Sequence, residues 1–453
     1  MAVKTILFLA GFFLCSGGAL LAPLFGVAGY VLYYTMGLGW WAAPVSHWGI
    51  RYSYTLALAT GLGALIHWRK LRFGKPILSI QEKLVLLFLG IVWLSTVYGG
   101  ATTGESYLVS DHPSLKLSKI VIFCLLLTHI VTSIRKLNVF FWVLIIGTLH
   151  LGIKAYQSPS HMFISGRLEN VGGPDFRSAN DLAVFLAVMI PVIGIMFLKT
   201  HWPGKILCAV SGVCALNAIV LTRSRTGLLG LVCGALVLAF FVPGRHRNKV
   251  IVGLIVAGIG FVALMDTRFI NRSQTILQGT KVQDQSAQGR IDIWRGAVKM
   301  IMDKPLGVGA GNFYQNIGQY VPNAKNRDAH NTYIRCAAEL GLHGFALLTI
   351  LIVNSALMIK NIKHQIAALP GKFRTEPQLI IGSLAASFTV FIVAGLTGTM
   401  LYLESFWWWL LLPVCLQRCI NNLRDEVTVA EEKQEHSSTK FSKAGRQSKK
   451  HKK

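Results

Sequence analysis

Residues 289–312 read GRIDIWRGAVKMIMDKPLGVGAGN, and after a polar link residues 330–344 read HNTYIRCAAELGLHG. The two segments close the longest polar interval of the chain and lead directly into an apolar run. The 453-residue chain is 53% hydrophobic and only 14% charged, whereas a soluble domain carries roughly 25% charge. The sequence therefore predicts an all-α, polytopic integral membrane protein with one large loop outside the membrane, at about 266–334.

Apolar runs long enough to cross a bilayer, roughly 17–25 residues each, recur along the chain. Residues 5–40 form either one kinked helix with a re-entrant end or two short helices broken at Pro23. Counting this region once predicts about twelve transmembrane helices, with both termini on the same side. The other apolar runs lie near 52–68, 82–98, 117–134, 138–156, 180–198, 205–222, 226–242, 249–265, 335–360, 377–396 and 398–418.

Positive charge in the short loops predicts the orientation of these helices. One set of loops holds far more Lys and Arg than the alternate set, and such loops face the cytoplasm. The predicted cytoplasmic loops are 69–80, 135–137, 199–205, 243–249 and 360–374, whereas 99–116, 157–179, 223–225 and 266–334 share the outer face. We assign 1–420 to the transmembrane domain and 421–453 to a basic, disordered cytoplasmic tail.

The net charge of +26 is distributed between apolar runs and in the tail. This distribution favours contact with anionic membrane lipids over nucleic acid. The eight cysteines lie in or beside apolar runs without CxxC or His/Cys clusters, so neither a disulfide framework nor a metal site is predicted. The glycines of PLGVGAGN lack a following GK[ST] and predict a tight turn rather than a nucleotide-binding loop. No cofactor is predicted.

Helical spacing of Ile291, Trp294, Val298 and Ile301 predicts a short amphipathic helix over 291–303 that lies against the membrane or the helix bundle. Farther along the chain, Trp407 to Trp409 are typical of an aromatic belt at the membrane interface.

Three ionisable residues stand out around the large loop. Arg225, with Arg223 beside it, lies in TRSRTG between two apolar runs. An arginine at membrane depth costs about 2.5–3.5 kcal/mol or more, so it marks a ligand path or extends to the headgroups as a topological anchor. Arg290 could bind phosphate oxygens bidentately or pair at the surface. His330 could act as a general base or hold the next helix, for which Asn331 is the expected N-cap.

Two acidic residues, Glu339 and Glu404, lie near the outer ends of apolar runs, where an unpaired carboxylate is costly. They could pair with the arginines.

Four segments in this order, spanning roughly 165–345, resemble the O-antigen ligase and O-antigen polymerase (Wzy-type) superfamily of polytopic membrane glycosyltransferases. They are GRLENVGGPDFRSANDLA (166–183), SRTGLLG (224–230), GRIDIWRGAVKMIMDKPLGVGAGNF (289–313) and HNTYIRCAAELGLHG (330–344). The resemblance implies an enzyme that moves a glycan from undecaprenyl pyrophosphate to an acceptor hydroxyl, such as lipid A core, without cofactor or metal. It implies a multi-pass protein of the bacterial inner membrane with a periplasmic active site.

Residue by residue, the resemblance implies that Arg225 and Arg290 bind the diphosphate and that His330 activates the acceptor. Arg223, Arg167 and Asn180 lie in matching segments as substrate-binding candidates. A polysaccharide polymerase or a protein O-oligosaccharyltransferase of the same superfamily is the alternative, with a growing glycan or a protein as acceptor. A polysaccharide transporter or flippase is the alternative of another class, although the paired broken helices and repeated halves of many transporters are not seen.

Overall fold

The computed structural model describes residues 3–37, 41, 43–71, 76–99, 112–242, 244–274 and 285–450, without the side chains of 46, 245, 271–287 and 429–450. Most of the predicted outer loop 99–116 and part of the loop 266–334 lie outside these residues.

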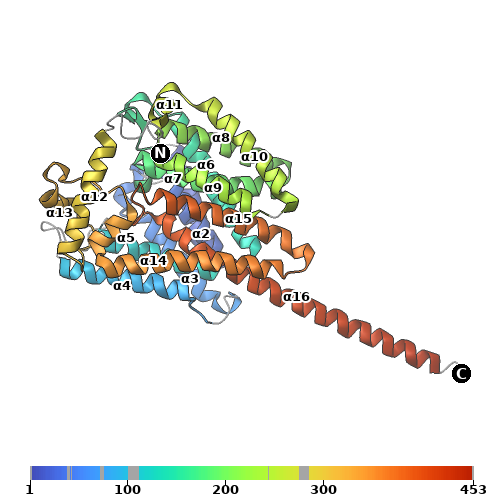
Figure 1. Cartoon of the computed structure of the whole chain (residues 1–453). Helices are drawn as coiled ribbons and strands as arrows, with labels where there is room; N and C mark the ends of the chain where they lie inside the picture. The colour runs from blue at the N-terminus through green and yellow to red at the C-terminus, as the bar shows by residue number, and fades with distance from the viewer. Residues whose placement is uncertain are drawn as a thin grey trace.

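Helices make up almost all of the described structure (Figure 1). Nine of them are long and apolar enough to cross a membrane, and three shorter apolar helices accompany them in the described ranges. The predicted all-α polytopic fold is confirmed. The helices are α1 (Val3–Leu21), α2 (Leu24–Met36), α3 (Tyr52–Ile66), α4 (Ile80–Gly99), α5 (Pro113–Ile130), α6 (Ile134–Tyr156), α7 (Ala179–Lys199), α8 (Trp202–Thr222), α9 (Arg225–Phe241), α10 (Gly244–Leu264), α11 (Thr267–Gln274), α12 (Gln285–Asp303), α13 (Phe313–Tyr320), α14 (Thr332–Ala367), α15 (Gly371–Ala394) and α16 (Glu404–Lys450).

A short antiparallel hairpin of β1 (Phe163–Ile164) and β2 (Arg167–Leu168) follows α6, with Phe163 opposite Leu168. The hairpin belongs to the same end of the bundle as α12 and α13, which we call the loop end.

The first two helices form a helical hairpin, so the alternative of two helices broken at Pro23 is correct. Gly37, just after α2, packs against Gly173 of the segment after α6, and the charge of Lys4 acts on Lys154 near the end of α6. The start of α1 and the end of α2 therefore both lie at the loop end, whereas α16 leaves the bundle at the opposite end (Figure 1). The prediction that both termini lie on the same side is wrong, because α2 adds one more pass through the bundle.

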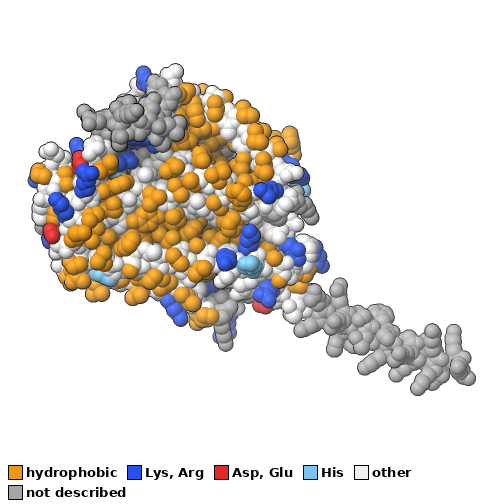
Figure 2. Space-filling view, viewed as in Figure 1, with side chains coloured by type: hydrophobic (Ala, Val, Ile, Leu, Met, Phe, Trp, Pro, Cys, Tyr) orange, Lys and Arg blue, Asp and Glu red, His pale blue; other side chains and the backbone are white. Residues whose placement is uncertain are grey.

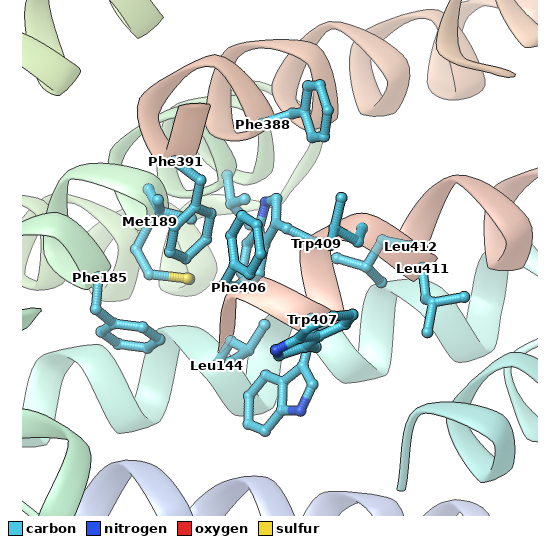
Figure 3. Packing of buried hydrophobic residues seen from close by; sticks show 14 of the residues in the cluster. Leu144, Phe185, Met189, Phe388, Phe391, Phe406, Trp407, Trp409, Leu411 and Leu412 are labelled. Atoms are coloured by element: carbon cyan, nitrogen blue, oxygen red, sulfur yellow. The ribbon is translucent and has the colours of Figure 1, made fainter. Parts of the chain in front are cut away.

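Three consecutive tryptophans at the start of α16 belong to the main hydrophobic core, and Figure 3 shows Trp407 and Trp409 among its buried side chains. Trp407, Trp408 and Trp409 are fully buried, so the predicted interfacial belt is wrong. Successive residues point about 100° apart on a helix, and each tryptophan meets an aromatic ring from a different helix. The ring centroids lie 5.1 Å apart for Phe88–Trp407, 4.8 Å for Tyr34–Trp408 and 5.9 Å for Phe391–Trp409.

The outside of the bundle is apolar over much of the face in Figure 2, with charged side chains gathered toward its margins. Helix α10 contributes the most open stretch, because only 11% of its apolar window is buried. Such a surface suits contact with lipid chains rather than water.

Helix α16 continues to Lys450, where the sequence predicts a disordered tail from 421. Between 421 and 450 the chain has no proline and is rich in Glu, Lys, Arg and Gln, which favour helix. The division into domains stays a prediction.

The hairpin of α1 and α2 makes a prediction about sidedness. Cysteines replacing exposed Lys4 and Arg295 should react with a membrane-impermeant maleimide from one side of sealed vesicles, and one replacing exposed Arg424 should react only from the other side. The parent protein, whose described cysteines are buried or half-buried, is the control. Labelling of Lys4→Cys and Arg424→Cys from the same side would contradict the hairpin.

Candidate functional site

Helix α12 is the predicted amphipathic helix of the large loop, and it packs on α13 and the start of α14. Its buried residues are Ile293, Ala297 and Met300, whereas Ile291 and Val298 are exposed. The helix is therefore confirmed, but its predicted buried face is partly wrong.

Gly296 explains which face of α12 is buried. A Cβ at this position would lie 2.4 Å from Cγ2 of Val321 and 3.4 Å from Cβ of Tyr320. Only glycine allows so close a contact, and this contact turns Ile293 and Ala297 inward. At the edge of the buried face lies the partly buried Trp294, whose Nε1 donates to the Ala329 carbonyl at 2.7 Å. Helix α12 is thus fixed to the residue that precedes His330.

The glycine-rich segment after α12 is a tight turn, as predicted. Gly307, Gly309 and Gly311 have φ of 90°, 102° and 84°, which favours glycine. The Val308 and Gly309 amides donate to the carbonyls of Ala338 and Glu339 at 2.9 and 3.0 Å, so the turn packs on the first turns of α14.

His330 lies directly before α14 in a left-handed conformation, with φ of 47°, which is uncommon for a non-glycine residue and costs free energy. Asn331 caps the helix as predicted and accepts from the Tyr333 and Ile334 amides at 2.9 and 3.0 Å. The N-cap fixes the backbone of His330 at the N-terminus of α14.

The imidazole of His330 has both a carboxylate and arginines near it. Its Nδ1 lies 3.6 Å from Oδ2 of Asp328. Burial lowers the pKa of His330 below its ordinary value, and the charges of Arg290 and Arg167 lower it further, against the opposite effect of Asp328. The imidazole is therefore neutral near neutral pH and able to accept a proton.

Arg290 and the turn that carries Arg225 meet at the segment 395–399. Nη1 of Arg290 lies 3.5 Å from the Thr397 carbonyl, and Oγ1 of Thr226 lies 2.9 Å from Oγ1 of Thr397. The structure thus brings Arg290, the Arg225 turn and His330 together at the loop end, from three separate parts of the chain.

Arg167 and Asn180 contact one another and join this group. Nη2 of Arg167 donates to Oδ1 of Asn180 at 2.6 Å, and its Nε donates to the Thr222 carbonyl at 3.2 Å. The Ser224 hydroxyl donates to the same amide oxygen at 2.8 Å. These bonds tie the β-hairpin and the start of α7 to the turn before Arg225.

Arg223 is directed elsewhere. It is buried with φ of 48°, its Nη1 donates to the Gly166 carbonyl, and its Nη2 lies 2.5 Å from Oδ2 of Asp266. Although partial burial alone would raise the pKa of Asp266, the bond from Arg223 holds it below its ordinary value. The side chain of Arg223 therefore joins the hairpin to the segment after α10.

A cavity of about 360 Å³ adjoins His330. Apart from His330, the charged residues around it were not singled out from the sequence, because they come from three distant segments. Each is unremarkable alone, and only the fold brings them together. Its charged lining consists of Lys116, Asp175, Asp181, Asp328, His330 and Arg335.

A buried ion-pair network forms the wall of this cavity beneath Asp328. Nε of Arg335 lies 2.9 Å from Oε1 of Glu339, and its Nη1 lies 3.2 Å from Oδ1 of Asp328. Nη1 also donates to the Tyr314 hydroxyl at 3.0 Å, and the Tyr402 hydroxyl donates to Oε2 of Glu339 at 2.8 Å.

The expected pairing of the acids with the candidate arginines is wrong. Glu339 pairs with Arg335 in the preceding turn of its own helix, and Oε2 of Glu404 accepts from the Tyr30 hydroxyl at 3.0 Å. The Arg335–Glu339 spacing of four residues within an apolar run is the signal that could have predicted this pair.

The described residues include no group of three or more His, Cys, Asp or Glu that could hold a metal ion.

Removing one member of the buried pair should be costly. Arg335→Gln leaves Glu339 without a cation and should destabilise the protein by about 3–5 kcal/mol, seen as a lower midpoint of thermal unfolding in detergent. Adding Glu339→Gln should recover part of the loss, and Arg295→Gln, whose side chain is 74% exposed, should change nothing. An unchanged midpoint in Arg335→Gln would contradict the network.

Comparison with known proteins gives two findings. Residues 210–349 match the family model described as O-Antigen ligase. The chain is also similar to the teichuronic acid biosynthesis protein TuaE of Bacillus subtilis (strain 168), with 24% identity over 362 residues, which cover 73% of this chain and 70% of the relative. The family match contains Arg225, Arg290 and His330, whereas Arg167 and Asn180 precede it.

Proposed function

The chain belongs to the O-antigen ligase and polymerase superfamily, and from this premise we propose that it transfers a glycan from undecaprenyl pyrophosphate to an acceptor hydroxyl at its loop end. The observation that carries this proposal is the meeting of Arg290, the Arg225 turn and His330 around residues 395–399. Ligase-type transfer, with lipid A core or a similar acceptor, is the form we favour. In this proposal the loop end faces the periplasm of the inner membrane.

The arginines supply the donor site. The leaving group is a lipid pyrophosphate, whose negative charge grows as the bond to the anomeric carbon breaks. Guanidinium groups of Arg225 and Arg290 bind phosphate oxygens through paired N–H donors and stabilise that charge in the transition state. Arg167, held by Asn180, adds a third positive charge beside His330.

His330 supplies the base. In the transfer step, the acceptor oxygen forms a bond to the anomeric carbon while its proton passes to Nε2 of His330. The glycosidic C–O bond breaks, and undecaprenyl pyrophosphate leaves with the electron pair. Asp328, 3.6 Å from Nδ1, orients the ring and stabilises the imidazolium that forms. Arg223 acts as a positioning residue that holds the turn before Arg225.

The alternatives predict different products. Loss of a ligase leaves full-length glycans on the carrier lipid, whereas loss of a polymerase leaves single repeat units. A protein O-oligosaccharyltransferase transfers to Ser or Thr. A transporter or flippase forms no product from purified protein, lipid-linked donor and acceptor.

The donor arginines make the first kinetic prediction. Arg290→Ala and Arg225→Ala should each lower the transfer rate by roughly 10²–10³-fold, because each removes a preorganised donor to the leaving group. Arg295→Ala, five residues from Arg290 on the exposed side of α12, is the matched control and should retain the wild-type rate. The rates are measured with purified protein in lipid nanodiscs. Wild-type rates in Arg290→Ala would contradict the donor site.

The pH dependence of the transfer reaction makes the second kinetic prediction. His330 acts in its neutral form and its pKa is lowered, so kcat/KM should fall only below about pH 6.5, the ordinary pKa of histidine. Asp328→Asn removes a charge that raises this pKa, so the acid limb should move to lower pH while the maximal rate falls. Asp303→Asn, at the end of α12, is the control. An acid limb that moves upward in Asp328→Asn would contradict the role of His330 as the base.

A further inference from the structure

The cavity beside His330 has a different character from the region around the arginines. Neither Arg225 nor Arg290 is among its lining residues, whereas His330 and Asp328 are. His330 therefore stands between two regions, one with arginines and one with three carboxylates.

The two cations that line the cavity are already paired. Nζ of Lys116 forms a short ion pair with Oδ1 of Asp175, and Arg335 is held by Asp328 and Glu339. Because both cations are already paired with carboxylates, the described lining has no cation left over for a pyrophosphate, which disfavours its binding there.

Two polar groups of the lining have no partner in the described part of the chain. Asp181, in the first turn of α7, makes neither a hydrogen bond nor an ion pair there, although the amide oxygen of its neighbour Asn180 accepts two hydrogen bonds. Oγ1 of Thr399 is buried and also has no hydrogen-bond partner there. Buried polar groups are nearly always satisfied, so the Thr399 hydroxyl indicates that something polar fills the cavity. The half-buried Asp181 carboxyl lines the same cavity and can contact the same ligand.

The hydrogen-bonding chemistry of Asp181 and Thr399 indicates the class of ligand that the cavity binds. A carboxylate accepts hydrogen bonds from two hydroxyls, and a threonine hydroxyl both donates and accepts. A sugar ring with neighbouring hydroxyls, uncharged or carrying an amino group, satisfies both residues and, unlike a phosphate, needs no further cation.

We propose that this cavity is the acceptor subsite and that Asp181 and Thr399 bind the hydroxyls of the acceptor sugar, an inference that rests on the function proposed above. The acceptor then approaches His330 from the carboxylate side and the lipid pyrophosphate from the arginine side. Asp181 and Thr399 determine how tightly the acceptor binds, and the arginines determine how tightly the donor binds.

The test uses full-length protein in nanodiscs and two probes. One is the acceptor oligosaccharide, the core oligosaccharide freed from lipid A by mild acid, and the other is inorganic pyrophosphate. Asp181→Asn and Thr399→Val should each weaken oligosaccharide binding about 10- to 100-fold, as expected for lost hydrogen bonds to a charged or buried group. Thr399→Ser, which keeps the hydroxyl, should bind like the wild type. Pyrophosphate binding should be unchanged in Asp181→Asn and lost in Arg290→Ala.

The isosteric variants keep the fold, which is checked by the midpoint of thermal unfolding. Oligosaccharide binding that is absent in the wild type, or unchanged in Asp181→Asn and Thr399→Val, would overturn the acceptor subsite. So would tighter pyrophosphate binding in Asp181→Asn, because it would place the phosphate in the cavity. Failure of the proposed function looks different: the wild type then binds no pyrophosphate and forms no product from lipid-linked donor, whatever Asp181 does.

Discussion

The loop end depends on the high cost of burying a charge without a partner at membrane depth. Arg335 shows how the cost is met, because one guanidinium contacts Glu339, Asp328 and the Tyr314 hydroxyl together. Arg223 does the same with Asp266 and the Gly166 carbonyl. These bonds cross from helix to loop, so they fix irregular segments that have few apolar contacts of their own.

Because these bonds hold the irregular segments in place, the fold can position the residues of the candidate site. The network beneath Asp328 and the bond from Trp294 to Ala329 hold the short segment 328–330 on both sides. His330 can then keep a strained backbone conformation, because the surrounding contacts determine it. In the function we propose, that rigidity holds the base still while a flexible lipid-linked donor and an acceptor approach it.

Several features followed from the sequence because they depend on local patterns. Apolar runs predicted the spans, the glycines after Pro305 predicted the turn, and Asn331 predicted the cap of α14. Arg290 and His330 were singled out as charges beside apolar runs, and the structure brings them together. Other features depend on contacts between distant segments. The burial of Trp407 to Trp409 requires aromatic rings from α2, α4 and α15, and the buried face of α12 follows from the close approach at Gly296. The cavity beside His330 was not predicted, because its residues lie in separate helices and loops.

The most direct test of this account is an experimental structure of the full chain with bound undecaprenyl pyrophosphate. The account predicts pyrophosphate oxygens about 3 Å from the guanidiniums of Arg225 and Arg290, with Nε2 of His330 facing the position of the departing sugar. A pyrophosphate seated among Asp175, Asp181 and Asp328, or bound at the opposite end of the bundle, would contradict it.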